Sequence, residues 1–194
     1  INKKGEIQMK LLFRTLSLLI IFSFACFAQF TADMVTTESG VTKTNKFYSE
    51  NPYYRMDIEE QGQEGYVIVD HNEGVTKVVM PAEQMYMVMS SSGMQSMSND
   101  VFQSIEKQKE QYESNLVGSE TIDGYDCEIY EVVIDGNVVS KYWQSPDIEY
   151  PIKVISGANN DMIMELKNIE AGDVDDSMFQ IPDGYTKMDM PGMQ

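Results

Sequence analysis

Apolar and polar residues alternate along much of this chain, and this pattern constrains its fold more than any other feature. In the segment 53–60, Tyr54, Met56 and Ile58 alternate with charged residues, and methionines repeat the pattern in 84–90. A β-strand places successive side chains on opposite faces, so a period of two is typical of a half-buried strand. The chain is therefore predicted to consist mainly of strands.

Turn sequences separate these segments at short intervals. They are Ser39-Gly40, His71-Asn72-Glu73-Gly74, Asp135-Gly136-Asn137 and Gly157-Ala158-Asn159-Asn160-Asp161. Between and around them we expect about ten short strands, which is the habit of an antiparallel sheet or barrel. The predicted strands are 30–37, 43–50, 53–60, 66–70, 75–80, 84–90, 127–135, 138–144, 151–156 and 162–169.

One segment has a helical pattern instead. Asn99-Asp100 can cap a helix over 101–114, with Val101, Phe102, Ile105 and Tyr112 on one side and charged residues on the other side. A single amphipathic helix inserted into a run of strands can cover or plug one mouth of an open barrel. The tail from Asp173 onward is expected to be mostly irregular.

The first 28 residues predict export. Met9, Lys10 and Arg14 precede the apolar run 16–24, and small residues follow up to Ala28. This order is typical of a secretory signal peptide, and the apolar run is short for a membrane span. We predict that residues 1–28 comprise upstream residues and a secretory signal peptide, which is cleaved after Ala28. Residues 29–194 are predicted to form one domain, located in the periplasm or outside the cell.

Two alternatives to an exported protein without a membrane anchor are compatible with this sequence. The apolar run could be retained as a membrane anchor. Cys26 follows Ser23-Phe24-Ala25, which loosely resembles a lipoprotein signal, and acylation of Cys26 would anchor the protein to a membrane. The signal-peptide interpretation is preferred over both.

Net charge excludes one class of partner. The whole chain carries −17, and residues 29–194 carry about −20 because most of the signal segment's charges are basic. Such a surface repels phosphate backbones, so no nucleic acid is expected to bind.

Residues suited to catalysis are few. Cys127 lies in a predicted strand between Asp126 and Glu128, and carboxylates beside a thiol raise its pKa and make it a poor nucleophile. It is predicted to be buried. His71, the single histidine, is predicted to be an exposed turn residue without partners for a triad or a zinc site.

The acidic cluster around Asp175 lacks the spacing of a calcium loop and is predicted to cap a turn before Met178. Neither a metal site nor a cofactor is expected, and no catalytic residue is assigned.

Methionine is the unusual component, with 15 in the chain. Met85, Met87 and Met89 lie on one face of a predicted strand, and others follow in the loop and at the end of the chain. Methionine is an adaptable apolar residue of binding surfaces, and its thioether is also a soft ligand for Cu(I). An apolar lining is favoured, with Cu(I) binding as the alternative.

Three motifs in the second half resemble those of an uncharacterised bacterial exported domain family. They are Gly118-Ser119-Glu120-Thr121-Ile122-Asp123-Gly124-Tyr125-Asp126-Cys127-Glu128-Ile129-Tyr130, the pair Tyr142-Trp143 followed by Tyr150-Pro151-Ile152-Lys153, and Asp175-Asp176-Ser177-Met178-Phe179-Gln180-Ile181-Pro182-Asp183-Gly184-Tyr185. That family looks related to the periplasmic lipoprotein carriers of the LolA-like superfamily. The resemblance covers nearly all of residues 30–193.

The resemblance implies a mainly β (α+β) fold: a curved, antiparallel, incomplete β-barrel with one inserted helix acting as lid or plug. It implies a concave face that holds acyl chains, no catalytic residues, and therefore a non-enzymatic binder of a hydrophobic small molecule or lipid. A monomer is expected, and an envelope protein is a possible partner. A structural or interaction domain with a filled core is a further alternative. The predicted apolar lining is Tyr54, Met56, Ile58, Met85, Met87, Met89, Met162, Met164 and Leu166.

Overall fold

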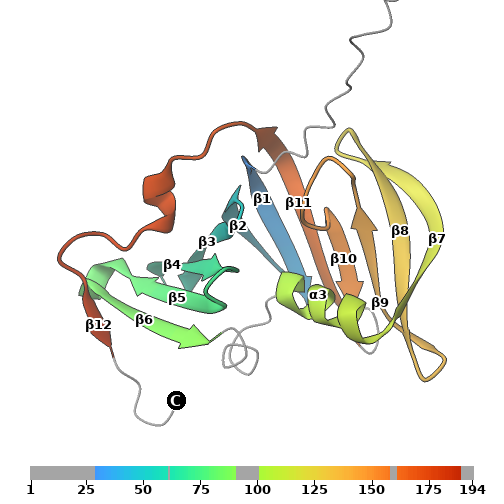
Figure 1. The fold of residues 1–194 in the computed structure, drawn as a ribbon, viewed down its shortest axis with the longest axis horizontal. Coiled ribbons are helices and arrows are strands. Elements are labelled where there is room, and N and C mark those ends of the chain that lie inside the picture. The colour runs from blue at the N-terminus through green and yellow to red at the C-terminus, as the bar shows by residue number, and fades with distance from the viewer. Residues whose placement is uncertain (1–28, 61, 91–100, 158–160, 189–194) are drawn as a thin grey trace, which may run out of the picture.

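A computed structural model describes residues 29–60, 62–90, 101–157 and 161–188 (Figure 1). The predicted signal peptide with Cys26 and the predicted helix cap at Asn99-Asp100 lie outside the described residues. The strands are β1 (Gln29–Glu38), β2 (Val41–Glu50), β3 (Tyr53–Glu60), β4 (Gln63–Asp70), β5 (Val75–Met80), β6 (Met85–Ser90), β7 (Glu113–Ile122), β8 (Tyr125–Ile134), β9 (Asn137–Gln144), β10 (Lys153–Ser156), β11 (Met162–Ala171) and β12 (Thr186–Met188). The helices are the α-helix α3 (Val101–Gln111) and the short 3₁₀ turns η1 (Pro81–Glu83) and η2 (Asp176–Phe179).

All twelve of these strands belong to one sheet, in the order β12-β6-β5-β4-β3-β2-β1-β11-β10-β9-β8-β7. Neighbouring strands are antiparallel except β12 and β6, which run parallel. The sheet curves strongly but does not close, and α3 lies inside the curve (Figure 1). The predicted fold class, a mainly β incomplete barrel with one helix, is confirmed.

Tight turns explain how consecutive strands become neighbours. Asp135 and Gly136 form the whole connection between β8 and β9, with φ values of 50° and 78°. Two consecutive residues with positive φ match the twist of a two-stranded hairpin, and glycine adopts this conformation without a steric penalty. The predicted turn at this position therefore determines which strands pair.

The helix is shorter than predicted. It ends at Gln111 rather than Ser114, and Tyr112 is exposed because the chain then enters β7, which pairs with β8 from Glu113 onward. Nearly every side chain of β7 is exposed, and β7 is an edge strand of the described sheet. An edge strand of this kind has no alternation of apolar residues, so the sequence pattern did not indicate it.

An aromatic cluster joins the helix to the inner face of the sheet. The ring of Phe102 lies 4.9 Å from that of Tyr150, 5.3 Å from that of Phe47 and 6.0 Å from that of Tyr54, measured between centroids. All four side chains are almost completely buried. Ring pairs at these separations add stabilisation beyond the apolar area they bury. This cluster is the centre of the inner core.

A second core lies on the outer face of β3–β6. There the C-terminal segment after β11 packs Val174 and Phe179 against Tyr66, Ile68 and Val79. As predicted, most of the described tail from Asp173 onward is irregular, but it also contains η2 and β12, and it covers this face. Its apolar residues are too widely spaced to form a periodic pattern, which is why the sequence did not reveal the contact.

Arg55 helps to hold that segment in place. Its guanidinium carbon lies 3.7 Å from the centre of the Tyr66 ring, its Nε donates to Asp57 Oδ1 at 2.7 Å, and its Nη1 donates to the carbonyl oxygen of Met178 at 3.3 Å. Asp175 caps η2, because its carboxylate accepts a hydrogen bond from the backbone N–H of Ser177 at 2.9 Å. The predicted capped turn is confirmed.

Truncating Phe179 to alanine is expected to destabilise the fold. Phe179 is 6% exposed and stacks on Tyr53 at 5.9 Å between centroids. Losing a buried ring leaves a cavity that typically costs about 3–5 kcal/mol. Urea unfolding of Phe179→Ala should show this loss, whereas Leu116→Ala, at a position 58% exposed, should change stability by less than about 0.5 kcal/mol. Equal stability of both variants would contradict the proposed role of the outer core.

Candidate ligand-binding pocket

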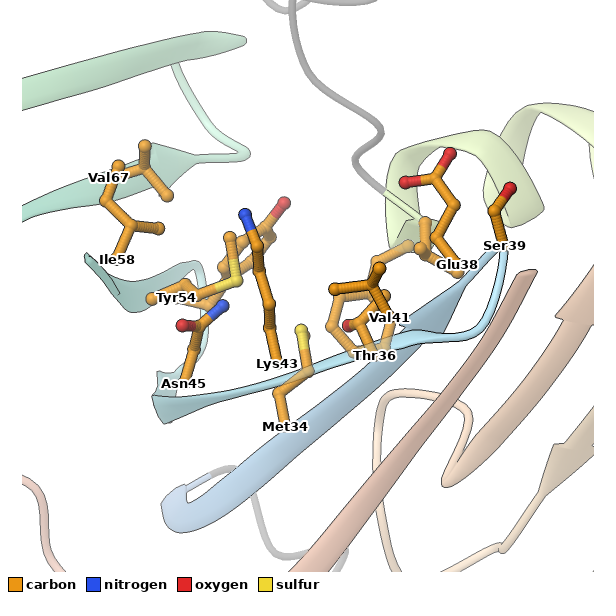
Figure 2. Close-up of a pocket in the computed structure, with 13 residues that line it drawn as sticks. Met34, Thr36, Glu38, Ser39, Val41, Lys43, Asn45, Tyr54, Ile58 and Val67 are labelled. Atoms are coloured by element: carbon orange, nitrogen blue, oxygen red, sulfur yellow. The ribbon is translucent and has the colours of Figure 1, made fainter. Parts of the chain in front are cut away.

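A pocket of about 510 Å³ opens on the inner face of the sheet, beside the start of α3 (Figure 2). This volume lies within the range of about 300–1,000 Å³ that is usual for small-molecule sites. Its lining residues are Met34, Thr36, Glu38, Ser39, Val41, Lys43, Asn45, Tyr54, Met56, Ile58, Val67, Val101 and Phe102.

Apolar side chains form one part of the lining. Tyr54, Met56 and Ile58 come from alternate positions of β3, so the strand pleat points all three to the inner face. Met56 lies opposite Val67 of β4 in the strand register, which places Val67 on the same face. The helix contributes Val101 and Phe102, and the contact of Phe102 with the aromatic cluster fixes this wall.

Polar side chains form the other part, near the tip of the β1–β2 hairpin. Met34 lies opposite Asn45, and Thr36 lies opposite Lys43 in the register of the two strands. Together with Glu38, these polar residues occupy inward-facing positions that a filled barrel would give to apolar residues. The pocket therefore has an apolar side and a polar side.

The predicted lining residues divide into two groups. Tyr54, Met56 and Ile58 line the pocket. The other six do not: Met164 and Leu166 are fully buried, Met162 is partly buried against the same core, Met89 is buried with Val67, and Met85 and Met87 are half-buried on β6.

The difference has a physical reason. Strand β11, which carries Met162, Met164 and Leu166, contributes to the core around α3, so its inward side chains contact protein instead of open space. Ligand binding by these nine residues remains a prediction.

Sequence reasoning missed several lining residues. Met34 could have been found, because Phe30, Ala32 and Met34 form a period-two apolar series in β1. Thr36 and Lys43 could not, since an inward-facing polar residue looks like an outward-facing one until the strand register is known.

The single histidine and the cysteine of the predicted strand, His71 and Cys127, both lie outside the pocket. His71 is exposed in the turn between β4 and β5, as predicted, and its Nε2 lies 3.1 Å from the hydroxyl oxygen of Tyr150. Cys127 is 2% exposed, as predicted, and burial is the main cause that raises the pKa of its thiol, with the charges of Asp126 and Glu120 acting in the same direction.

Among residues 29–60, 62–90, 101–157 and 161–188, no group of three or more His, Cys, Asp or Glu side chains is placed to hold a metal ion. The alternative Cu(I) site on methionines is not addressed by that finding. Met87 lies opposite Met188 of β12, and Met85 lies opposite Met80 of β5, while Met94, Met97, Met190 and Met193 fall outside the described residues. Cu(I) binding stays a prediction.

In the part of the chain that the structure describes, none of the helices has the length and apolarity needed to cross a bilayer.

The sequence matches the profile of a domain of unknown function, DUF4412, over residues 31–149 and 147–185. A comparison with curated protein sequences gives no match. As the motif resemblance predicted, the matched family is uncharacterised.

Several solved structures align with this chain over most of its length. An uncharacterized conserved protein from Thermus thermophilus superposes with a TM-score of 0.57 at 7% identity, over 83% of this chain and 90% of that one. The structure of the Pseudomonas aeruginosa MucA/MucB complex gives 0.51 at 12% identity, over 81% of this chain and 57% of the matched chain. A LolA superfamily protein from Nitrosomonas europaea gives 0.39 at 10% identity, over 81% and 96%.

We expect Cys127 to be unreactive in the folded protein. Thiolate is the nucleophilic form, and a raised pKa together with burial leaves little accessible thiolate at pH 8. Alkylation of Cys127 by iodoacetamide, followed by mass spectrometry of its peptide, should be slow in buffer and at least about a hundredfold faster in concentrated urea. Rapid alkylation of the native protein would contradict the inferred burial.

Proposed function

This chain belongs to the DUF4412 family, and we propose that it is a non-enzymatic binding protein that holds a hydrophobic small molecule, or the acyl chain of a lipid, in the inner-face pocket. The observation that carries the proposal is an open pocket of about 510 Å³ on a concave sheet face, bordered by Tyr54, Met56, Ile58 and Val67.

The energetics of such a site need no specific polar contact. Burying apolar surface contributes about 25 cal/mol per Å², so an alkyl chain gains about 0.8 kcal/mol for each methylene group that leaves water. Met34 and Met56 suit this role because methionine adapts to irregular apolar partners.

A binding role is favoured over catalysis by the chemistry of the lining. Neither His nor Cys is among the thirteen lining residues, and a nucleophile paired with a histidine base is therefore missing from this pocket as described. The motifs of the second half have structural roles instead. Glu120 accepts a hydrogen bond from Trp143 Nε1 at 2.8 Å, and Phe179 fills the outer core.

We propose that the protein acts in the periplasm of the cell envelope or, if it is secreted, outside the cell. The order of charged, apolar and small residues in 9–28 supports export. The similarly folded Pseudomonas aeruginosa structure is a complex of two proteins, which supports an envelope protein as a partner that supplies or receives the ligand.

Placing a carboxylate in the apolar wall should weaken binding. We expect Ile58→Glu to reduce the affinity for a neutral apolar fluorophore, N-phenyl-1-naphthylamine, by about tenfold or more, because a charge would have to lose water when the fluorophore enters. Fluorescence titration measures the change. The matched control is Val138→Glu, which introduces the same carboxylate at a position 54% exposed and away from the pocket, and which should alter affinity less than about twofold.

Two outcomes would oppose the proposal. One is the absence of saturable fluorophore binding by the unmodified protein together with no lipid in an organic extract of natively purified material. The other is equal affinity of Ile58→Glu and the unmodified protein, which would locate binding elsewhere.

A further inference from the structure

The inward-facing side of the β1–β2 hairpin changes character along its length. In β1 the inward residues Phe30, Ala32 and Met34 are buried, whereas Thr36 is only partly buried and Glu38, at the hairpin tip, is exposed. In β2 the inward series runs from the buried Phe47 through Asn45 to the exposed Lys43. The apolar depth of the pocket thus leads to a polar mouth at the hairpin tip.

Lys43 is the basic residue of this mouth. In Figure 2 its side chain extends into the pocket, with the amino nitrogen on the side of Tyr54 and Ile58, whereas the carboxylate of Glu38 lies on the side of α3. The residues that the structure describes provide no ion pair for Lys43. Its neighbour Lys46 faces outward and is paired with Asp33, with 2.7 Å between Nζ and Oδ1.

The position of Lys43 matters because the chain as a whole is strongly acidic. A net charge of −17 repels anionic molecules, so an anionic ligand could enter only where a local cation offsets that field. Lys43 is the single cation among the thirteen lining residues. A flexible lysine at a solvent-exposed mouth can donate to a carboxylate or phosphate oxygen through its three N–H groups.

We propose that Lys43 binds the anionic headgroup of a single-chain amphiphile whose hydrocarbon tail lies between β3, β4 and α3. This rests on the proposed function, since the tail occupies the same pocket. The headgroup is a carboxylate or a phosphate monoester, and the volume of about 510 Å³ matches one small-molecule ligand instead of a lipid with several acyl chains.

The test compares headgroups on one tail length. Bound N-phenyl-1-naphthylamine is displaced from the unmodified full chain by dodecanoate, dodecyl phosphate, dodecanol or dodecylphosphocholine, and the fluorescence decrease gives each affinity. We expect dodecanoate or dodecyl phosphate to bind about fivefold or more tightly than dodecanol, and high salt to reduce that ratio. The better of the two anions identifies the headgroup.

Two lysine variants then assign the effect. Lys43→Met keeps most of the length of the side chain and removes its charge, so the ratio of anion affinity to alcohol affinity should fall to about one. Lys46→Met removes a lysine from the outer face of the same strand and should keep the ratio. Circular dichroism and fluorophore binding check that both variants are folded.

The outcomes separate the two proposals. If the fluorophore does not bind the unmodified protein, the proposed function fails. If it binds but dodecanol displaces it as well as the anions do, or Lys43→Met keeps the anion preference, the role of Lys43 is overturned. A preference for dodecylphosphocholine that is lost in Glu38→Gln would also overturn the role of Lys43, because Glu38 would then bind the cationic choline group.

Discussion

The contact between Phe102 and the rings of Phe47, Tyr54 and Tyr150 is the interaction on which the remaining architecture depends. Helix α3 has eleven residues and is mostly polar, and an isolated helix of that length is only marginally stable in water. Its position is therefore determined by what it buries. Phe47 and Tyr54 come from β2 and β3, while Tyr150 lies between β9 and β10, so the cluster joins distant parts of the curved sheet. Further along the helix, Gln108 accepts a hydrogen bond from Ser140 of β9 at 2.5 Å. The helix thus fills the inner face toward β9 and leaves space beside β2, β3 and β4.

Much of the fold was predictable because period-two alternation depends only on the pleat of a strand. The segments 53–60 and 75–80 were predicted with the bounds that the structure has. The turn residues Asp135 and Gly136 revealed their hairpin because few residues tolerate positive φ. Strand β7 and the packing of the C-terminal segment on the sheet were not predicted, because neither has a periodic pattern. Strand β7 is exposed along nearly its whole length, and the C-terminal segment is stabilised by contacts with residues more than a hundred positions away, such as the stacking of Phe179 on Tyr53. A local pattern contains no signal for such contacts.

The pocket was predictable only in part. Alternation identified Tyr54, Met56 and Ile58 as neighbours on one face, and all three line it. It treated Met164 and Leu166 in the same way, although their strand contributes to the filled core. Which apolar face meets a helix and which stays open depends on tertiary packing. The polar residues Lys43 and Asn45 needed the register of β1 against β2, since a one-residue change of register would turn them outward.

The parallel pairing of β12 with β6 has a consequence for the behaviour of the protein at high concentration. Strand β6 has the sequence Met-Tyr-Met-Val-Met-Ser, a short apolar segment without charge or proline, and its backbone groups would form an open edge if β12 were absent. Segments of this composition at open edges are templates for intermolecular β-sheet and amyloid. The C-terminal segment crosses the outer face and pairs with that edge. It therefore prevents the edge from pairing with a strand of another molecule. Proteolysis within the C-terminal segment would therefore promote aggregation by exposing the edge of β6, which lies away from the aromatic cluster around Phe102.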